Sequence, residues 1–415
     1  MMKKTIIALA SALTICVGAF AQEQAASKPQ FKWYGFIRTY FAFDTRVSSA
    51  GTEDLYFYMP KDRNMQGGVD LNEEPSFRFA ALTSRLGLDV TGYEVAGYKI
   101  GAKIETDFYS GVSGVTGTAQ LRLRQAFVTV GKGGRTWKIG QAWHPMAADL
   151  PDIFSLESGA PFGPFSRTPQ INFEGRLSDA VSLTAAAIWQ MQYTSTGPEG
   201  ASANYIKYGC TPELYLGLNF KWNTGLFRVG ADMLSIKPRM YNSESTAKVS
   251  DRLTTFNLFE YGQFKAGNFT VKEKITYAND GSHMNMVGGY GVSGVNSDGS
   301  WSYTASRNLS GWATLQYKEK NSNWVPSILF GYEKSLGTSE DLTGSFWCKN
   351  SANTVNQMFR VQPEILYNLG KLAFGLEYMA TGVEYGKVSG KRMVVDSDLH
   401  WIVNHRIQMM VKYTF

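Results

Sequence analysis

The chain has 415 residues, of which 44% are hydrophobic, 14% aromatic and 18% charged, and its formal net charge is +6. A charge this mild lacks the basic footprint of a nucleic-acid-binding protein, so no nucleic-acid partner is expected. The 42 glycines and the high aromatic content favour many strands joined by turns, arranged as one large barrel or two ordinary domains.

The first 21 residues have the three parts of a secretory signal peptide. Two lysines form a basic head, residues 5–17 are apolar, and the A-x-A sequence at 19–21 is typical of a cleavage site. An isoleucine precedes Cys16, whereas lipidation signals need a small residue there, so lipidation is not expected. Residues 1–21 are therefore predicted to be removed on export.

Residues 31–415 are predicted to form one all-β domain, a transmembrane antiparallel β-barrel, after a short N-terminal segment at 22–30. No apolar run outside the signal peptide reaches the roughly 18 residues that a helical span requires. Instead, apolar and polar side chains alternate in about sixteen segments, as the period of two in a strand demands. These segments are 31–44, 77–92, 98–109, 121–131, 135–143, 169–176, 180–193, 212–222, 226–237, 254–266, 268–279, 307–320, 325–335, 357–370, 372–385 and 404–415.

Short and long connections alternate between these segments. The short ones lie at 92–97, 131–134, 177–179, 223–225, 267, 321–324 and 370–371. The long ones lie at 45–76, 110–120, 144–168, 194–211, 238–253, 280–306, 336–356 and 386–403. Short turns at one end and long loops at the other are the layout of outer-membrane barrels.

The size of the predicted barrel decides which face meets lipid. A soluble barrel turns its apolar face inward, but about sixteen strands enclose more space than side chains can fill. The apolar face is therefore expected to point outward, and the polar face to line a water-filled lumen. This places Ile104 and Phe108 outside and Glu105 and Asp107 inside, and the apolar positions of 212–222 also share one face.

The segment 404–415 alternates without a break and ends on an aromatic residue. Tyr413 and Phe415 fall on the lipid face at an interface, where aromatic girdles lie, whereas Thr414 faces water. The pattern resembles the closing strand of bacterial outer-membrane proteins, whose barrel assembly machinery reads a terminal phenylalanine. Tyr413 and Phe415 are accordingly predicted to form an assembly signal. The expected partners are this machinery, the outer-membrane lipids and lipopolysaccharide.

Three segments carry a family resemblance: SRLGLD at 84–89, LRLRQAFV at 121–128 and KIGQAW at 138–143. Over roughly residues 30–180 the chain resembles the general porin superfamily, and most closely its DcaP-like outer-membrane branch. The resemblance implies a diffusion channel for small polar or anionic solutes, usually a homotrimer. Some members carry a coiled-coil stalk before the barrel, for which the segment 22–30 is too short.

The third long connection is the predicted constriction loop. Residues 144–168 lie where porins fold a loop into the barrel, and their four prolines stiffen this segment. Bases from the first four strands are expected to face acids of the loop, because opposed charges in a narrow passage orient polar solutes. The alternative is that each base is an ordinary solvated lumen residue. The bases are Arg38, Arg85, Lys103, Arg122 and Arg124, and the acids are Asp149, Asp152 and Glu157.

Other residues that could bind a ligand or form a disulfide carry weaker signals. The GxGxxG of residues 289–294 lacks a βαβ context, so it does not predict a nucleotide site. The four histidines are too scattered for a metal-ligand spacing and are interpreted as loop or lumen residues, so neither a metal nor a cofactor is expected. Cys210 and Cys348 fall in predicted external loops, where a disulfide and two free thiols are both open alternatives.

Three classes of function are compatible with such a barrel. A passive porin in the outer membrane is favoured by the charged lumen. A barrel enzyme needs a Ser-His or Asp-His constellation that no motif supplies, so no catalytic residue is predicted. A surface-binding or adhesive barrel is the other alternative, since the aromatic-rich segment 301–312 has the composition to bind carbohydrate or a host surface.

Overall fold

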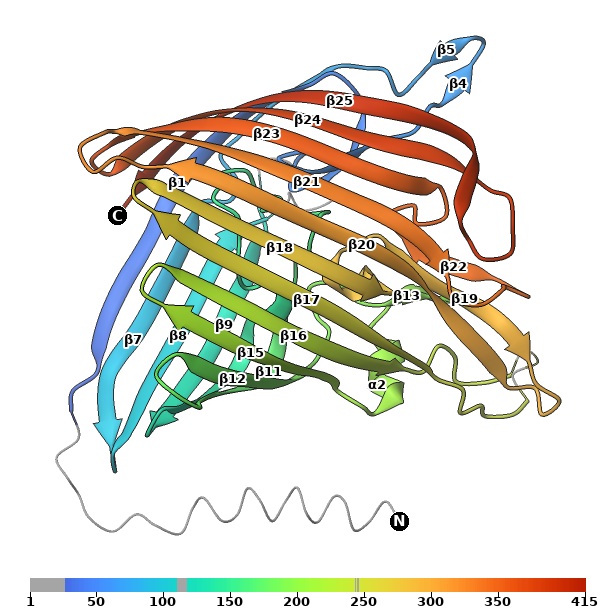
Figure 1. The fold of residues 1–415 in the computed structure, drawn as a ribbon, viewed down its shortest axis with the longest axis horizontal. Coiled ribbons are helices and arrows are strands. Elements are labelled where there is room, and N and C mark those ends of the chain that lie inside the picture. The colour runs from blue at the N-terminus through green and yellow to red at the C-terminus, as the bar shows by residue number, and fades with distance from the viewer. Residues whose placement is uncertain (1–26, 110–117, 243, 245) are drawn as a thin grey trace.

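The computed structural model describes residues 27–109, 118–242, 244 and 246–415. Sixteen strands form a closed antiparallel barrel in which consecutive barrel strands are neighbours (Figure 1). The barrel closes where β1 pairs with both β7 and β25. The barrel strands are β1 (Gln30–Asp44), β7 (Arg85–Val95), β8 (Tyr98–Phe108), β9 (Leu121–Lys132), β10 (Arg135–Trp143), β11 (Arg167–Arg176), β12 (Val181–Ile188), β15 (Glu213–Trp222), β16 (Gly225–Ile236), β17 (Leu253–Ala266), β18 (Phe269–Asn279), β20 (Trp301–Tyr317), β21 (Trp324–Thr338), β23 (Val355–Leu369), β24 (Leu372–Val388) and β25 (Val395–Thr414).

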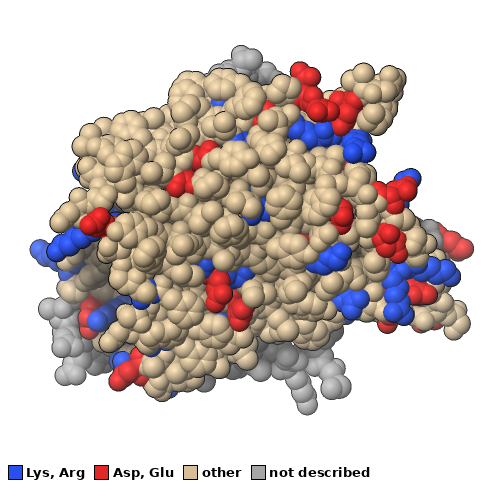
Figure 2. Space-filling view, turned by 45° about the horizontal axis from the view of Figure 1, so that its top comes forward, with Lys and Arg blue, Asp and Glu red and all other residues tan. Residues whose placement is uncertain are grey.

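Side chains alternate across the barrel wall as the sequence predicts. On β25, Ile407 and Met409 are exposed on the outside, whereas Arg406 and Gln408 are 1% exposed and face the interior. Other exposed apolar residues on the outer face are Ile104, Phe108, Leu214, Leu216, Phe374 and Leu376. On the face drawn in Figure 2, charged residues lie mainly toward the two ends, and other residues form most of the area between them. The exterior therefore suits lipid.

Tight turns join the strands at one end of the barrel, and long loops join them at the other, which we call the outer end. The turn at Ala96 and Gly97 has positive φ at both residues, 51° and 74°, as a two-residue hairpin turn requires. The predicted alternation of short and long connections is confirmed except at the last predicted long connection, between β24 and β25.

Several predicted boundaries are wrong. A strand extends as far as a neighbouring strand supplies hydrogen-bond partners for its backbone, and the sequence pattern does not show where that supply ends. The predicted strand 77–92 is split into β6 (Ser76–Ala80) and β7, and β6 pairs with the second half of β1. The predicted long loop 386–403 is short, since β24 and β25 keep pairing as far as Val388 and Val395. The predicted loop 280–306 contains β19 (Gly288–Val295), which pairs with β20 and with β22 (Phe346–Lys349).

The main hydrophobic core lies inside the outer half of the barrel, where long loops pack against each other and the wall. Most of its loop residues come from loop 45–75, loop 144–166 and loop 280–287. Their core residues include Tyr58, Met59, Met146, Phe162, Phe165, Met284, Met286 and Val287. The smaller elements of the loops are β2 (Ser48–Gly51), β3 (Tyr56–Pro60), β4 (Met65–Gln66), β5 (Val69–Asp70), η1 (Pro145–Ala147), β13 (Thr196–Gly197), β14 (Gly200–Ala201), α2 (Asn204–Gly209) and η2 (Gly281–Met284).

Three further sequence predictions concern the chain ends and the thiols. The predicted signal peptide, residues 1–21, and the first part of the segment 22–30 lie outside the described residues. Cys210 and Cys348 are both free thiols, so the disulfide alternative is not realised. Within the described ranges, no helix is long and apolar enough to cross a membrane.

The outward position of Phe415 leads to a first prediction. Its backbone N–H donates to the carbonyl of Gly35 at 3.1 Å, and its ring lies against Gly35, at the seam where β25 meets β1. We expect Phe415→Asp to lower the amount of inserted barrel several-fold, because a charge replaces an interfacial aromatic. The control is Thr414→Asp, on the opposite face of the strand. Heat-modifiable protein in the outer-membrane fraction measures insertion, and equal levels of the two variants would contradict the assembly role.

Candidate functional site

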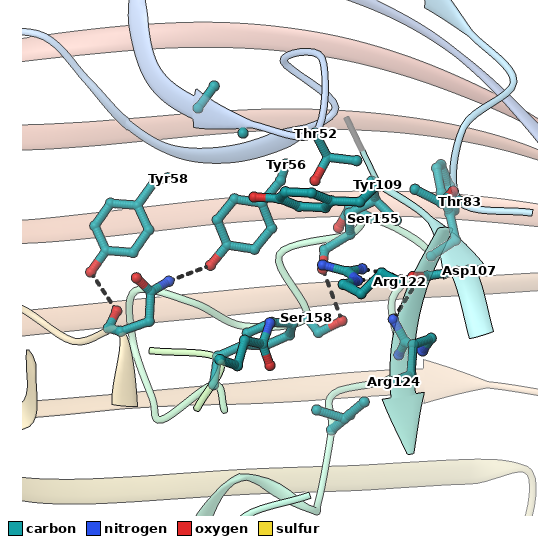
Figure 3. Close-up of a pocket in the computed structure, with 18 of the residues that line it drawn as sticks. Thr52, Tyr56, Tyr58, Thr83, Asp107, Tyr109, Arg122, Arg124, Ser155 and Ser158 are labelled. Carbon is teal, nitrogen blue, oxygen red and sulfur yellow. Dashed lines mark hydrogen bonds and ion pairs between the residues drawn. The ribbon is translucent and has the colours of Figure 1, made fainter. Parts of the chain in front are cut away.

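A cavity of about 720 Å³ lies between the wall formed by β1, β7, β8 and β9 and the loops that enter the barrel (Figure 3). Loop 144–166 lines it with residues between 150 and 158 and with Phe165, and loop 45–75 lines it with residues between 48 and 61. The lining contains more bases than acids. The bases are Arg38, Lys61, Arg85, Arg122, Arg124 and Lys412, and the acids are Glu105 and Asp107.

Arg122 and Arg124 are alternate residues of β9, so both side chains face the lumen. Arg122 donates to both carboxylate oxygens of Asp107, from Nε to Oδ1 at 2.9 Å and from Nη2 to Oδ2 at 3.0 Å. Arg124 donates from Nη1 to Oδ2 of Asp107 at 2.6 Å and from Nε to Oε1 of Glu105 at 2.7 Å. Figure 3 shows both guanidinium groups beside Asp107. This paired geometry holds the arginines in fixed positions on the wall.

Arg85 and Arg38 extend the basic wall toward β1. The Arg85 Nη1 lies 3.7 Å from Oε2 of Glu105, which also binds Arg124. Arg38 donates from Nε and Nη2 to the hydroxyl of Thr83, at 3.2 and 3.1 Å. No carboxylate of the described chain lies within ion-pair distance of Arg38. Three arginines therefore share two carboxylates and Arg38 has none, which leaves the wall with an excess of positive charge.

Arg167, at the start of β11, is a further buried base near the cavity that the sequence reasoning missed. Its guanidinium lies over the rings of Trp143 and Phe165, 4.6 and 5.4 Å from their centroids. Its two terminal nitrogens make no hydrogen bond among the described residues. Because both rings line the cavity, this charge adds to the positive potential there.

Lys103 does not belong to this cluster, contrary to the expectation. Its Nζ lies 2.9 Å from Oδ1 of Asp89 and donates to the hydroxyl of Tyr34 at 3.0 Å. Lys103 and Asp89 are direct partners across the β7–β8 ladder, so the carboxylate binds the lysine away from the cavity.

Loop 144–166 lies inside the barrel, but its acids do not face the arginines of β7 and β9. Each acid approaches a base on another part of the wall, because the loop crosses the lumen and turns these side chains toward β16, β18 and β23. The pairs are Asp149–Arg228 at 3.5 Å, Asp152–Lys272 at 2.5 Å and Glu157–Arg360 at 3.9 Å. The predicted opposition of loop acids and wall bases is therefore wrong.

The loop presents apolar and hydroxyl groups to the cavity instead. Ile153 and Phe154 line it together with Ser155 and Ser158. Figure 3 places the two serines across from Arg122 and Arg124. A solute in the cavity would thus meet cations on one side and neutral hydrogen-bonding or apolar groups on the other.

Loop 45–75 also enters the barrel, which sequence reasoning missed. Arg360 on β23 fastens two loops: it donates to the carbonyl of Tyr58 at 3.0 Å and to the carbonyl of Ala160 at 2.9 Å. The hydroxyl of Tyr385 donates to the carbonyl of Pro60 at 2.6 Å. The sequence signal was the apolar run YFYMP at 56–60, which has no place in an exposed loop.

Glu157 is the most deeply buried acid of loop 144–166. Burial raises the pKa of its carboxyl above the ordinary value, and the neighbouring Arg360 lowers that pKa in part. Both carboxylate oxygens lack a hydrogen-bond partner among the described residues. Glu157 therefore depends on the charge of Arg360 when it is ionised.

Two of the four histidines meet in space although they are far apart in the sequence. His144 begins loop 144–166 and His283 lies in η2, yet their Nε2 atoms lie 2.6 and 3.4 Å from the same oxygen of Glu213. Both residues lie in loops, as expected, but their separation along the chain gave no sign of this shared contact. Sequence spacing could not reveal the contact, because the barrel wall brings the two loops together.

Comparisons with known proteins support the architecture at the level of fold. No protein-family model and no curated protein sequence matches the chain. Among solved structures, the outer membrane channel DcaP of Acinetobacter baumannii superimposes with a TM-score of 0.68 at 19% identity, covering 96% of this chain and 100% of that chain. An anion-selective porin from Comamonas acidovorans gives 0.55 at 9% identity, covering 94% and 100%. The trimer form of OmpT from Vibrio cholerae gives 0.54 at 11% identity, covering 93% and 99%.

Proposed function

We propose that this chain is an outer-membrane porin that lets small polar or anionic solutes diffuse across the outer membrane. The observation that carries the proposal is the basic cavity inside a closed barrel with an apolar exterior. Such a barrel seals its own backbone hydrogen bonds against lipid, and its polar interior offers a path for solutes. The structural likeness to an outer membrane channel and to an anion-selective porin supports this reading.

The charge of the cavity favours anions over cations. Six basic and two acidic side chains line it, and Arg167 adds a buried charge behind the lining. In a narrow passage with protein walls, such charges raise the local concentration of ions of opposite sign. Arg122 is held by both oxygens of Asp107, and Arg124 is held by one oxygen of Asp107 and one of Glu105. Their charges therefore stay in place as solutes pass.

The proposed partners of the barrel are the lipids around it, the machinery that inserts it and further copies of the chain. Outer-membrane lipids and lipopolysaccharide would contact the apolar outer face, and the barrel assembly machinery would insert it after removal of the signal peptide. We propose a homotrimer as the assembled state, because the similar OmpT structure is described as a trimer form. The most exposed aromatic residues of the described chain lie on β1 and β6. Phe31 and Trp33 are near the turn end of β1, whereas Phe77 and Phe79 pair with the other half of β1, and a second copy would cover them.

The second prediction tests the channel itself. Purified protein added to a planar bilayer is expected to give discrete conductance steps. In a salt gradient, the sign of the reversal potential is expected to indicate that chloride is more permeant than the cation. The preference should weaken as salt rises, since the screening length falls from about 10 Å at 0.1 M to about 3 Å at 1 M. Folding is checked first by heat-modifiable gel migration. Folded protein that inserts without conductance would contradict the porin and favour the surface-binding alternative.

A further inference from the structure

Four ionisable side chains with no part in the proposed solute path converge near the outer end of the barrel. His144 is the first residue of loop 144–166, Glu213 begins β15, Asp232 lies on β16 and His283 lies in η2. All four side chains are no more than 2% exposed. Four separate elements thus place ionisable groups in one buried cluster.

The distances within the cluster suit a shared metal ion. The Nε2 of His283 lies 3.4 Å from Oε1 of Glu213 and 3.8 Å from Oδ2 of Asp232, too far for good hydrogen bonds. Metal–ligand bonds of about 2.0–2.2 Å place neighbouring ligand atoms about 3–4 Å apart. Ligand atoms of His144, Glu213 and Asp232 also lie within 4.8 Å of one another.

The hydrogen bonding of the cluster is incomplete. Oε2 of Glu213, both carboxylate oxygens of Asp232 and both ring nitrogens of His283 have no hydrogen-bond partner among the described residues. Buried polar atoms left in this state are costly, so each such group calls for an explanation. In the described chain, the only cationic groups within 4.0 Å of the two carboxylates are the histidines. A divalent cation would balance both carboxylate charges and occupy the unused atoms.

His144 has a different role, which its tautomer defines. Its Nδ1 accepts a hydrogen bond from the backbone N–H of Met146 at 3.2 Å. The proton of the neutral ring is therefore on Nε2, which lies 2.6 Å from Oε1 of Glu213 and donates to it. This contact orients Glu213. Oε1 accepts this one hydrogen bond and keeps a second lone pair that faces His283, and Oε2 has no partner among the described residues.

We propose that Glu213, Asp232 and His283 bind one divalent transition-metal ion, with zinc as the best fit, and that His144 is a positioning residue for Glu213. A histidine together with two carboxylates suits zinc and its first-row neighbours, whereas calcium and magnesium prefer oxygen ligands alone. Water completes the coordination. The ion would tie η2 to the wall beside the root of loop 144–166, where the Phe165 N–H donates to the Met284 carbonyl at 2.8 Å.

Metal content of the purified full-length barrel tests the site. The protein is folded in detergent, treated with chelator, incubated with zinc sulfate and desalted, and its zinc is then measured by mass spectrometry. We expect about one zinc ion per chain and a higher unfolding temperature. Asp232→Asn and His283→Gln should abolish saturable binding. His144→Gln should weaken binding roughly 10- to 100-fold, as loss of an orienting partner does.

The matched control is His405→Gln, which removes an exposed histidine bonded to Tyr378 and should leave zinc binding unchanged. Substoichiometric zinc in the wild type, or wild-type affinity in Asp232→Asn and His283→Gln, would overturn the proposal. If those variants fail to fold, cobalt(II) decides with the wild-type protein. Visible absorption that saturates near one equivalent supports the site, and its absence overturns it.

Discussion

Replacing both Arg122 and Arg124 by glutamine is expected to shift the reversal potential in a salt gradient toward cations. The change removes two of the six bases that line the cavity, and it releases Glu105 and Asp107, which these arginines neutralise. Released carboxylates in a confined passage attract cations, so both effects act in the same direction. Bilayer recordings at low and high salt measure the shift, which should shrink at 1 M because the screening length is then only about 3 Å.

A matched control separates position from total charge. Lys99→Gln with Lys103→Gln also removes two positive charges from the lumen face of β8, but neither lysine lines the cavity. We expect this control to shift the reversal potential much less. Heat-modifiable migration confirms folding of both variants. Equal shifts in the two double variants, or no shift at low salt in the arginine variant, would place the selective region elsewhere.

Two pairs of acid substitutions test whether the wall acids or the acids of loop 144–166 set the selectivity. Glu105→Gln with Asp107→Asn should move the reversal potential toward anions, because both acids line the cavity. Asp149→Asn with Asp152→Asn should have a smaller effect, since these acids pair with Arg228 and Lys272 outside the lining. A larger effect of the loop pair would restore the arrangement expected from the sequence alone.

The barrel was predictable because lipid imposes one rule on every strand. An outward residue such as Met409 must be apolar, its neighbour Gln408 faces a polar interior, and the period of two is visible without any tertiary information. Strand ends were less predictable. Beyond the lipid band this constraint disappears, and β24 and β25 continue to pair as far as Val388 and Val395.

The candidate site was only half predictable for a related reason. Arg122 and Arg124 sit on a strand, so their direction follows from alternation. Glu157 sits in a loop, whose path fixes direction, and that path turns the acid toward Arg360. For the entry of loop 45–75 into the lumen, the apolar run at 56–60 was the one local signal. The meeting of His144 with His283 depends on the three-dimensional path of two loops, which local sequence does not encode.

Arg360 holds both loop 45–75 and loop 144–166 by hydrogen bonds, which leads to the last prediction. Arg360→Met should make the channel current noisier and the channel more conductive. Arg360 is 1% exposed and donates to the carbonyls of Tyr58 and Ala160 and to the hydroxyl of Thr381. Methionine keeps much of the volume but leaves these acceptors unpaired and removes the positive charge beside Glu157. Losing one partner of a buried pair costs about 3–5 kcal/mol, enough to release loop segments from the wall.

Single-channel recordings measure this release as added open-channel current noise and a larger mean current, and thermal unfolding should begin at a lower temperature than in the wild type. The control is Arg392→Met. Arg392 pairs with Asp341 at 3.0 Å, but both side chains are more than half exposed, and such surface pairs contribute little. Because Arg392 fastens no loop inside the lumen, its loss should leave noise, current and unfolding temperature unchanged. If Arg360→Met behaved like this control, the two loops would have to be held in the barrel by their apolar core, through residues such as Phe162 and Met59, rather than by the arginine.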